Sequence, residues 1–168
     1  MASIKIAGTV NDSIVDGEGY RYTIFVQGCP HHCEGCHNPQ THDFAAGKTT
    51  DTDRLYEQII ENPLLSGVTF SGGEPFCQSA PLAELAKKIK ARNLDLWIYT
   101  GYTYEELIVS TDPAVQTLLS LADVLVDGRF DLNQRDLTLA FRGSRNQRVI
   151  DLNATRQQGR LLQKQLDN

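Results

Sequence analysis

Short apolar, β-branched stretches alternate along the chain with segments in which apolar residues recur at helical spacing. In one such segment Leu82, Leu85 and Ile89 would share one face of a helix, and the preceding Pro81 suits a first helical turn. The same reasoning predicts strands over residues 21–27, 68–70, 94–99 and 123–126, and helices over residues 52–61, 81–91, 104–108 and 114–121.

A regular alternation of strands and helices is typical of βαβ units, and therefore of an α/β fold with a parallel sheet. Right-handed crossovers place the carboxyl ends of such strands on one rim, which is where α/β proteins bind ligands. Five or six strands in 168 residues are too few to close an eight-stranded barrel. We therefore expect a partial, open (β/α) barrel, whose open side leaves room for a large substrate.

The chain shows no internal repeat, low-complexity stretch or linker, and its 168 residues suit one domain over residues 1–168. The tail over residues 151–168 carries four leucines among polar residues, with Gly159 between them. This pattern leaves open whether the tail is a frayed, flexible helix or a segment that docks on a partner.

Composition narrows the function classes. A net charge of −5 gives no electrostatic reason to expect a nucleic-acid partner. Apolar runs stay below the ~20 residues that a bilayer span needs, and the first residues lack a signal-peptide pattern. We therefore expect no nucleic-acid or membrane partner, and a cytoplasmic protein whose reducing surroundings keep thiols available as ligands.

Three of the four cysteines, Cys29, Cys33 and Cys36, stand within eight residues in the pattern C-x₃-C-x₂-C. Prolines and a glycine in and around this pattern predict an irregular loop rather than a helix. All four histidines lie within the pattern or shortly after it, at positions 31, 32, 37 and 42. The chain therefore gathers most of its potential soft and borderline metal ligands in one loop.

Three structures compete for this loop. A disulfide suits an odd number of close cysteines poorly. Structural zinc would add His31, His37, His42 or Cys77 to the three cysteines, although such sites usually draw their ligands as two separated pairs. A [4Fe–4S] cluster would take the three cysteines and leave its fourth iron without a protein ligand. The spacing favours the cluster and leaves zinc open.

Several segments resemble the radical S-adenosylmethionine (SAM) family. They are Asp16-Gly17-Glu18-Gly19 with Arg21, residues 25–29, residues 35–39, and Ser71-Gly72-Gly73-Glu74-Pro75, which is similar to the family's GGE segment. Residues 97–102, 124–130 and 141–148 narrow the resemblance to glycyl-radical-enzyme activases, in particular those of anaerobic ribonucleoside-triphosphate reductases. The family usually places an aromatic residue after the third cysteine, where this chain has His37.

The resemblance implies a partial barrel of the radical SAM type and a [4Fe–4S] cluster on Cys29, Cys33 and Cys36. The residues that it implies for SAM binding are Gly35, Cys36, His37, Gly72, Gly73 and Glu74. It implies no further catalytic side chain, because the cluster and SAM carry the chemistry. Reductive cleavage of SAM would yield a 5′-deoxyadenosyl radical that generates a glycyl radical on the reductase. The expected partners are therefore the anaerobic ribonucleoside-triphosphate reductase and an electron donor such as flavodoxin.

Other functions stay open at this point. They are activation of another glycyl radical enzyme such as pyruvate formate-lyase, small-molecule chemistry like that of the deazaguanine carboxylate synthases, and a non-enzymatic zinc or iron–sulfur module. We expect Cys77 to be a small buried side chain, and His31 and His32 to be solvated. Arg129 and Arg142 are expected either to contact the protein partner or to pair with nearby carboxylates.

Overall fold

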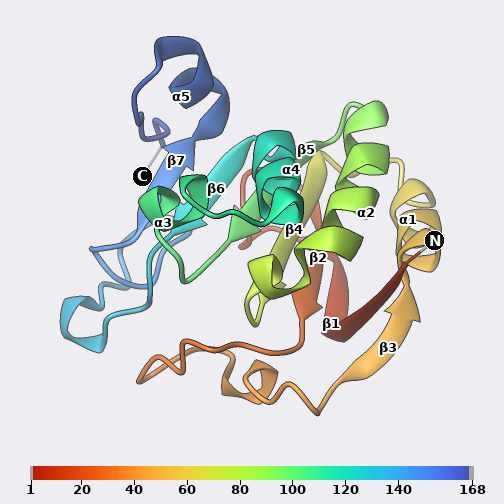
Figure 1. The fold of residues 1–168 in the computed structure, drawn as a ribbon, viewed down its shortest axis with the longest axis horizontal. Helices are drawn as coiled ribbons and strands as arrows, with labels where there is room; N and C mark the ends of the chain where they lie inside the picture. Colours follow the sequence, from red (N-terminus) through yellow and green to blue (C-terminus); the bar gives the residue numbers. More distant parts are fainter. Residues whose placement is uncertain (1, 167–168) are drawn as a thin grey trace.

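The computed structural model describes residues 2–166, which form a mixed α/β fold around one seven-stranded sheet (Figure 1). The strands are β1 (Ser3–Ser13), β2 (Arg21–Val26), β3 (Lys48–Asp51), β4 (Gly67–Gly72), β5 (Asp95–Tyr99), β6 (Val124–Asp127) and β7 (Arg148–Asp151). Their order across the sheet is β3-β1-β2-β4-β5-β6-β7. The central strands β2, β4, β5 and β6 run parallel, as predicted.

The flanks of the sheet correct the sequence-based expectation. Strands β1, β3 and β7 pair antiparallel with their neighbours, so the sheet is mixed rather than wholly parallel. These three strands were not predicted. Strands β3 and β7 form the two ends of the sheet order, which leaves the sheet open.

The helices of the described chain are α1 (Thr52–Ile60), α2 (Ser79–Ala91), α3 (Tyr104–Ile108), α4 (Pro113–Leu121) and α5 (Leu152–Gln158), with 3₁₀ turns η1 (Pro39–Thr41), η2 (Pro75–Gln78) and η3 (Leu132–Gln134). The side chains of Asp51, Asp112 and Asp151 accept backbone N–H bonds at the first turns of α1, α4 and α5. These caps explain why the three helices begin where they do. The four helices predicted from the sequence are confirmed to within two residues at each end.

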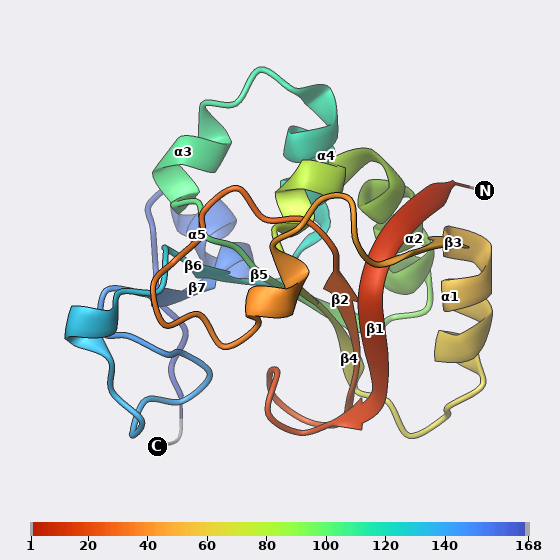
Figure 2. The same ribbon diagram turned by 90° about the horizontal axis from the view of Figure 1, so that it is seen from below.

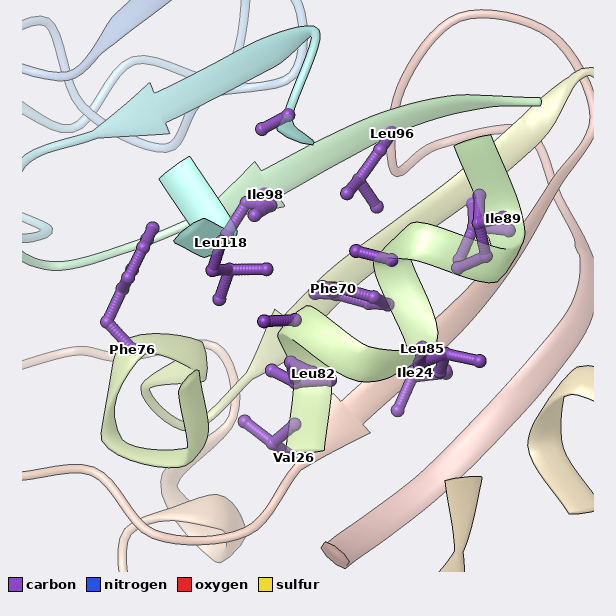
Figure 3. Close-up of a cluster of buried hydrophobic side chains, with 14 of the residues drawn as sticks. Ile24, Val26, Phe70, Phe76, Leu82, Leu85, Ile89, Leu96, Ile98 and Leu118 are labelled. Atoms are coloured by element: carbon purple, nitrogen blue, oxygen red, sulfur yellow. The ribbon is translucent and has the colours of Figure 1, made fainter. Parts of the chain in front are cut away.

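Helix α2 supplies the centre of the main core. Its residues Leu82, Leu85 and Ile89 are fully buried, and they lie among Phe70 of β4 and Ile98 of β5 (Figure 3). Burying a side chain of this size contributes about 1.5–3 kcal/mol, so this face of α2 fixes the helix to the sheet. Figure 2 shows α1, α2 and α4 gathered on the same side of the sheet. None of the helices in residues 2–166 is long and apolar enough to cross a membrane.

The other face of the sheet carries a smaller apolar cluster around Trp97, which is fully buried. Trp97 lies between two core residues of β5, so it points to the opposite face of the strand. The ring of Phe141 packs edge-on against Trp97 at 5.2 Å between centroids. Residues from the β6–β7 connection and from the tail therefore cover this second face.

The tail returns to the sheet after α5. The helix ends at Gly159, whose φ of +70° is a left-handed conformation that glycine adopts readily. Beyond it, Leu162 O accepts a hydrogen bond from Asp151 N at 3.0 Å, and Lys164 N donates to Val149 O at 2.7 Å. The tail as far as residue 164 is thus bonded to β7, Leu166 packs on the cluster around Trp97, and positions 167–168 lie outside the described residues.

Candidate active site

The carboxyl ends of the parallel strands lie along one rim of the sheet, beside a cavity of about 610 Å³. Gly72 and Gly73 at the end of β4 line this cavity, as do Thr100 and Gly101 after β5. Another wall comes from residues 28–42, which follow β2 and which we call the cysteine loop. The rim predicted as the ligand-binding edge is therefore where the candidate residues gather.

Main-chain hydrogen bonds close the base of the cysteine loop. Gly28 N donates to Thr41 O at 2.7 Å, and Cys29 N donates to His42 O at 3.2 Å. The side-chain amide of Gln27 donates to two further carbonyl groups near the end of the loop. Apart from the turn η1 the loop contains no helix or strand, which confirms the prediction of an irregular loop.

All three cysteines of the motif are free thiols that line the cavity. Cys29 is buried, whereas Cys33 and Cys36 are half-buried. Burial raises the pKa of the Cys29 thiol and of the Cys33 thiol above their ordinary value. Backbone N–H groups of His31 and Phe130 donate to these two sulfurs and lower each pKa in part. Soft sulfur ligands that also receive backbone hydrogen bonds suit an iron–sulfur cluster.

The three thiols do not converge on a single point. Within residues 2–166, no three histidine, cysteine or acidic side chains lie close enough together to bind one metal ion. The cysteines instead border a shared space. A cluster is larger than one ion and uses sulfur ligands that stand apart at its corners, so this donor set fits a cluster.

Cys77 stands apart from the other cysteines. It lies on η2 and is exposed, so the expectation of a buried side chain was wrong. Partial burial of the thiol, together with the negative charge of Glu74, raises the pKa of Cys77 to about 11. The residues that line the cavity include the other three cysteines but not Cys77. Its exclusion from the ligand set stays a prediction.

The four histidines have different surroundings. His31, His37 and His42 line the cavity, and the ring of His37 packs on Phe130 at 5.3 Å between centroids. Burial, with a smaller effect of His32, lowers the pKa of His42. His32 is exposed, as expected. The side chain of His31 is only 4% exposed, so the prediction that His31 is solvated was wrong.

The glycines of the site differ in what they face. Gly72 has φ of +91°, and a Cβ on it would stand 2.6 Å from Val26 N, so a larger residue would push β4 away from β2. Gly35 also has a positive φ, but its α-carbon faces the side chain of Leu132. Among the residues expected to bind SAM, Cys36, His37, Gly72 and Gly73 line the cavity, whereas Gly35 and Glu74 do not.

Glu74 is fully buried, and its carboxylate accepts hydrogen bonds from several parts of the rim. Gly101 N donates to Oε1 at 2.8 Å, and the His31 ring lies 2.6 Å from the same oxygen through Nε2. Thr100 Oγ1 lies 2.8 Å from Oε2, which also accepts from Phe76 N at 3.1 Å. Four protein donors thus share the two oxygens. Glu74 orders the rim instead of facing the cavity.

Arg21, which ends the first matching segment, is fully buried at the amino-terminal end of β2, at the edge of the sheet away from the rim. Its guanidinium pairs with Asp95 at 2.6 Å and donates to Thr69 Oγ1 at 2.7 Å and to Val68 O at 2.8 Å. It also lies over the ring of Trp97, 5.4 Å from the centroid. Arg21 therefore ties β2 to β4 and β5, a structural role that its place in the motif did not specify.

Some cavity residues were not singled out from the sequence. Tyr99 and Phe141 both line the cavity, and burial raises the pKa of Tyr99. Arg142, which the sequence did offer as a candidate partner contact, lines it too, and its Nε is buried without a hydrogen-bond partner among the described residues. From the sequence, His31 is a candidate zinc ligand or a solvated residue, and Tyr99 and Phe141 belong only to the segments that resemble the family.

The parallel strands of this α/β sheet end beside three free cysteines on one loop. This arrangement defines the class of protein as one that can hold a metal–sulfur centre at the rim of its sheet.

Residues 15–150 match the protein family described as 4Fe-4S single cluster domain. The chain is 38% identical over 143 residues to the anaerobic ribonucleoside-triphosphate reductase-activating protein of Pasteurella multocida, covering 80% of this chain and 89% of that one. It is also 38% identical over 149 residues to the protein of the same name from Escherichia coli (strain K12), covering 83% and 93%. The chain belongs to this family of reductase-activating proteins.

A solved structure, the crystal structure of QueE from Escherichia coli, superposes with a TM-score of 0.48 at 19% identity, over 60% of this chain and 54% of that one. This likeness is too low to support a conclusion.

Proposed function

We propose that this protein activates an anaerobic ribonucleoside-triphosphate reductase by generating a glycyl radical on it, through reductive cleavage of SAM at a [4Fe–4S] cluster. The observation that carries the proposal is the placement of three free cysteines around one cavity at the carboxyl ends of the parallel strands. Membership of the family adds the kind of partner. The chain covers about nine-tenths of these relatives, so the comparison concerns nearly whole proteins.

Cys29, Cys33 and Cys36 would hold the cluster. The backbone N–H groups that already point at all three of these sulfurs would then stabilise the negative charge of the thiolates. When bound and reduced, the cluster supplies the electron that cleaves SAM to methionine and a 5′-deoxyadenosyl radical. The protein contributes the position of the ligands and a partly enclosed space beside them.

We place SAM in the cavity beside the cysteines. A volume of about 610 Å³ lies within the range of small-molecule sites, roughly 300–1,000 Å³. His37, Gly72 and Gly73 line this space and are the residues through which SAM would be held. The contacts of Glu74 with four protein donors support an indirect role, in which it fixes the walls of the SAM site.

The substrate of the radical would be a glycine Cα–H in a loop of the reductase. The sheet ends at β3 and β7 without closing, and we propose that it corresponds to a partial (β/α) barrel that admits such a loop. We also propose a reducing, cytoplasmic setting, because thiolate ligands need one, and an electron donor such as flavodoxin.

Anaerobic reconstitution tests the proposal. The protein is loaded with iron and sulfide, mixed with SAM, a reductant and an anaerobic ribonucleoside-triphosphate reductase, and assayed for methionine release and for the glycyl-radical EPR doublet. We expect both signals, and neither in Cys36→Ala, which removes one cluster ligand. Pyruvate formate-lyase serves as the specificity control. A cluster-loaded protein that releases methionine but gives no doublet on the reductase would contradict the proposal.

A further inference from the structure

We propose that His31 is a positioning residue that locks the cysteine loop onto the rims of β4 and β5 through Glu74, and thereby fixes Cys29 and Cys33 as cluster ligands. The proposal rests on the function proposed above and adds to it a role for a side chain that lies inside the cysteine motif. It also separates His31 from the metal ligands, among which the sequence left it as a candidate for zinc.

Both ring nitrogens of His31 are occupied by protein partners. Arg129 Nε donates to Nδ1 at 3.1 Å, so Nε2 carries the proton and donates to Glu74 Oε1 at 2.6 Å. The ring also packs edge-on against Tyr102, with 4.7 Å between centroids. A Cβ on Gly101 would stand 2.4 Å from His31 Cδ2, so only glycine lets the ring reach this position. Protein contacts therefore hold both ring nitrogens and one edge of the His31 ring.

The partner of His31 is itself anchored. Glu74 is fully buried, and its carboxylate accepts from Gly101 N, Phe76 N and Thr100 Oγ1. These donors lie just beyond the central strands β4 and β5, with Phe76 on η2 and with Thr100 and Gly101 in the turn after β5. A hydrogen bond from His31 to this carboxylate thus connects the cysteine loop to the most firmly held part of the rim.

The tip of the cysteine loop has few other links to the fold. Pro30 has no N–H to donate. Within the described chain, the hydrogen bonds that join residues 30–35 to other elements are the two at the His31 ring and one from Phe130 N to the Cys33 sulfur. His31 lies midway between Cys29 and Cys33 along the chain, so its anchor restrains the direction of both sulfurs. Loss of the anchor should leave both ligands mobile.

The test compares His31→Ala with His31→Gln and with His32→Ala. Glutamine has an amide N–H that can reach Glu74 but lacks the ring, and His32 is the exposed neighbour in the same loop. Each variant is reconstituted anaerobically without reductase. The measurements are iron and sulfide per chain, the rate at which a chelator removes iron, and the EPR spectrum of the reduced cluster with and without SAM.

We expect His31→Ala to speed iron release on the order of 10-fold to 100-fold and to change the EPR spectrum, as loss of a residue that orients a ligand typically does. His31→Gln should recover most of the wild-type retention, and His32→Ala should resemble the wild type. Thermal unfolding of the metal-free variants shows whether the fold survives. If His31→Ala does not fold, Arg129→Ala takes its place, because it removes the other ring bond and should give a smaller increase in iron release.

The proposal would be overturned if His31→Ala released iron at the wild-type rate. The same holds for Arg129→Ala if that variant has to replace an unfolded His31→Ala. Equal losses in His31→Gln and His31→Ala would also overturn it, since the bond to Glu74 would then be irrelevant. The function proposed above fails separately, if the wild-type protein holds its cluster and installs no glycyl radical.

Discussion

The α-carbon of Gly73 lies directly against the carbonyl group of Gly28. A Cβ on Gly73 would stand 2.4 Å from Gly28 O and 3.0 Å from Thr41 O, both of which are backbone atoms at the base of the cysteine loop. Glu74 N donates to the same Gly28 oxygen at 2.8 Å. Gly73, the second glycine of the GGE segment, therefore lets the turn after β4 pack closely against the base of the cysteine loop. It also lines the cavity.

This contact predicts that Gly73→Ala distorts the cysteine loop more directly than it weakens the binding of SAM. The new methyl group must displace backbone, and overpacking of this kind costs about 1–3 kcal/mol. We expect a lower melting temperature of the metal-free protein and less iron per chain after reconstitution. Gly8→Ala is the matched control, because nothing lies within 4 Å of a Cβ at Gly8. Full iron content with weakened SAM binding alone would show that Gly73 serves only the ligand.

Cluster ligation should depend on Cys29, Cys33 and Cys36 and not on Cys77. Alanine at any of the first three positions removes a sulfur that lines the cavity, so the iron content and the brown colour of the anaerobic protein should be lost. Cys77→Ala should retain both, together with the EPR signal of the reduced cluster. A colourless wild-type protein with stoichiometric zinc and no inorganic sulfide would contradict this assignment and favour structural zinc.

The thiol of Cys77 should react slowly at neutral pH although the residue is exposed. Its pKa of about 11 keeps it protonated, and the thiolate is the form that is alkylated. At pH 8 the thiolate fraction is then about 1 in 1,000, and it rises about tenfold per pH unit as the pH increases towards the pKa. Iodoacetamide labelling of the metal-free protein, followed by mass spectrometry, should show a rate at Cys77 that still rises between pH 9 and 10. A rise of less than about twofold over this interval, as for an ordinary thiol with a pKa of about 8.5, would refute the raised pKa.

The structural role of Arg21 predicts that its replacement lowers the stability of the fold, although it removes none of the cysteine ligands. Arg21→Lys keeps the charge but cannot reproduce the forked contacts to Thr69, Val68 and Asp95, and it leaves buried acceptors unsatisfied. We expect the free energy of unfolding of the metal-free protein to fall by about 3 kcal/mol. Arg54→Ala on the exposed side of α1 is the control and should change it little. Equal unfolding curves for both variants would rule out this structural role.

The central sheet and its helices could be predicted because their apolar residues follow one clear period. The face formed by Leu82, Leu85 and Ile89 is an example, since all three are fully buried in the structure. Strand β1 has no such signal, because only its first part alternates and most of its second half is exposed. Strand β7 has four residues and is stabilised by pairing with β6, which a local pattern cannot show.

The same distinction holds for the site. The spacing of the cysteines and the strand ends predicted that Cys29, Cys36 and Gly73 would meet at one cavity, and the structure brings them together there. The roles of Glu74 and His31 could not be predicted, because they depend on contacts across 43 positions of the sequence. The local sequence around a polar side chain such as Glu74 or His31 gives no sign of whether it faces a ligand or a neighbouring strand.

The two arginines proposed as partner contacts should now behave differently. Arg129 bonds to His31, so its loss should weaken cluster retention and lower every activity in parallel.

Arg142 lines the cavity, its Nε is buried without a partner among the described residues, and its bond to Gln147 O is long at 3.5 Å. Because Arg142 borders the cavity and its terminal nitrogen is only weakly bonded, we expect the outer end of the guanidinium to be available to an incoming peptide. We expect Arg142→Ala to lower the glycyl-radical yield on the reductase several-fold more than it lowers methionine release without the reductase, as quantified by the EPR doublet and by chromatography. A parallel fall of the two yields in Arg142→Ala would mean that this arginine only supports the fold, because a residue that meets the substrate peptide must affect hydrogen abstraction more than SAM cleavage.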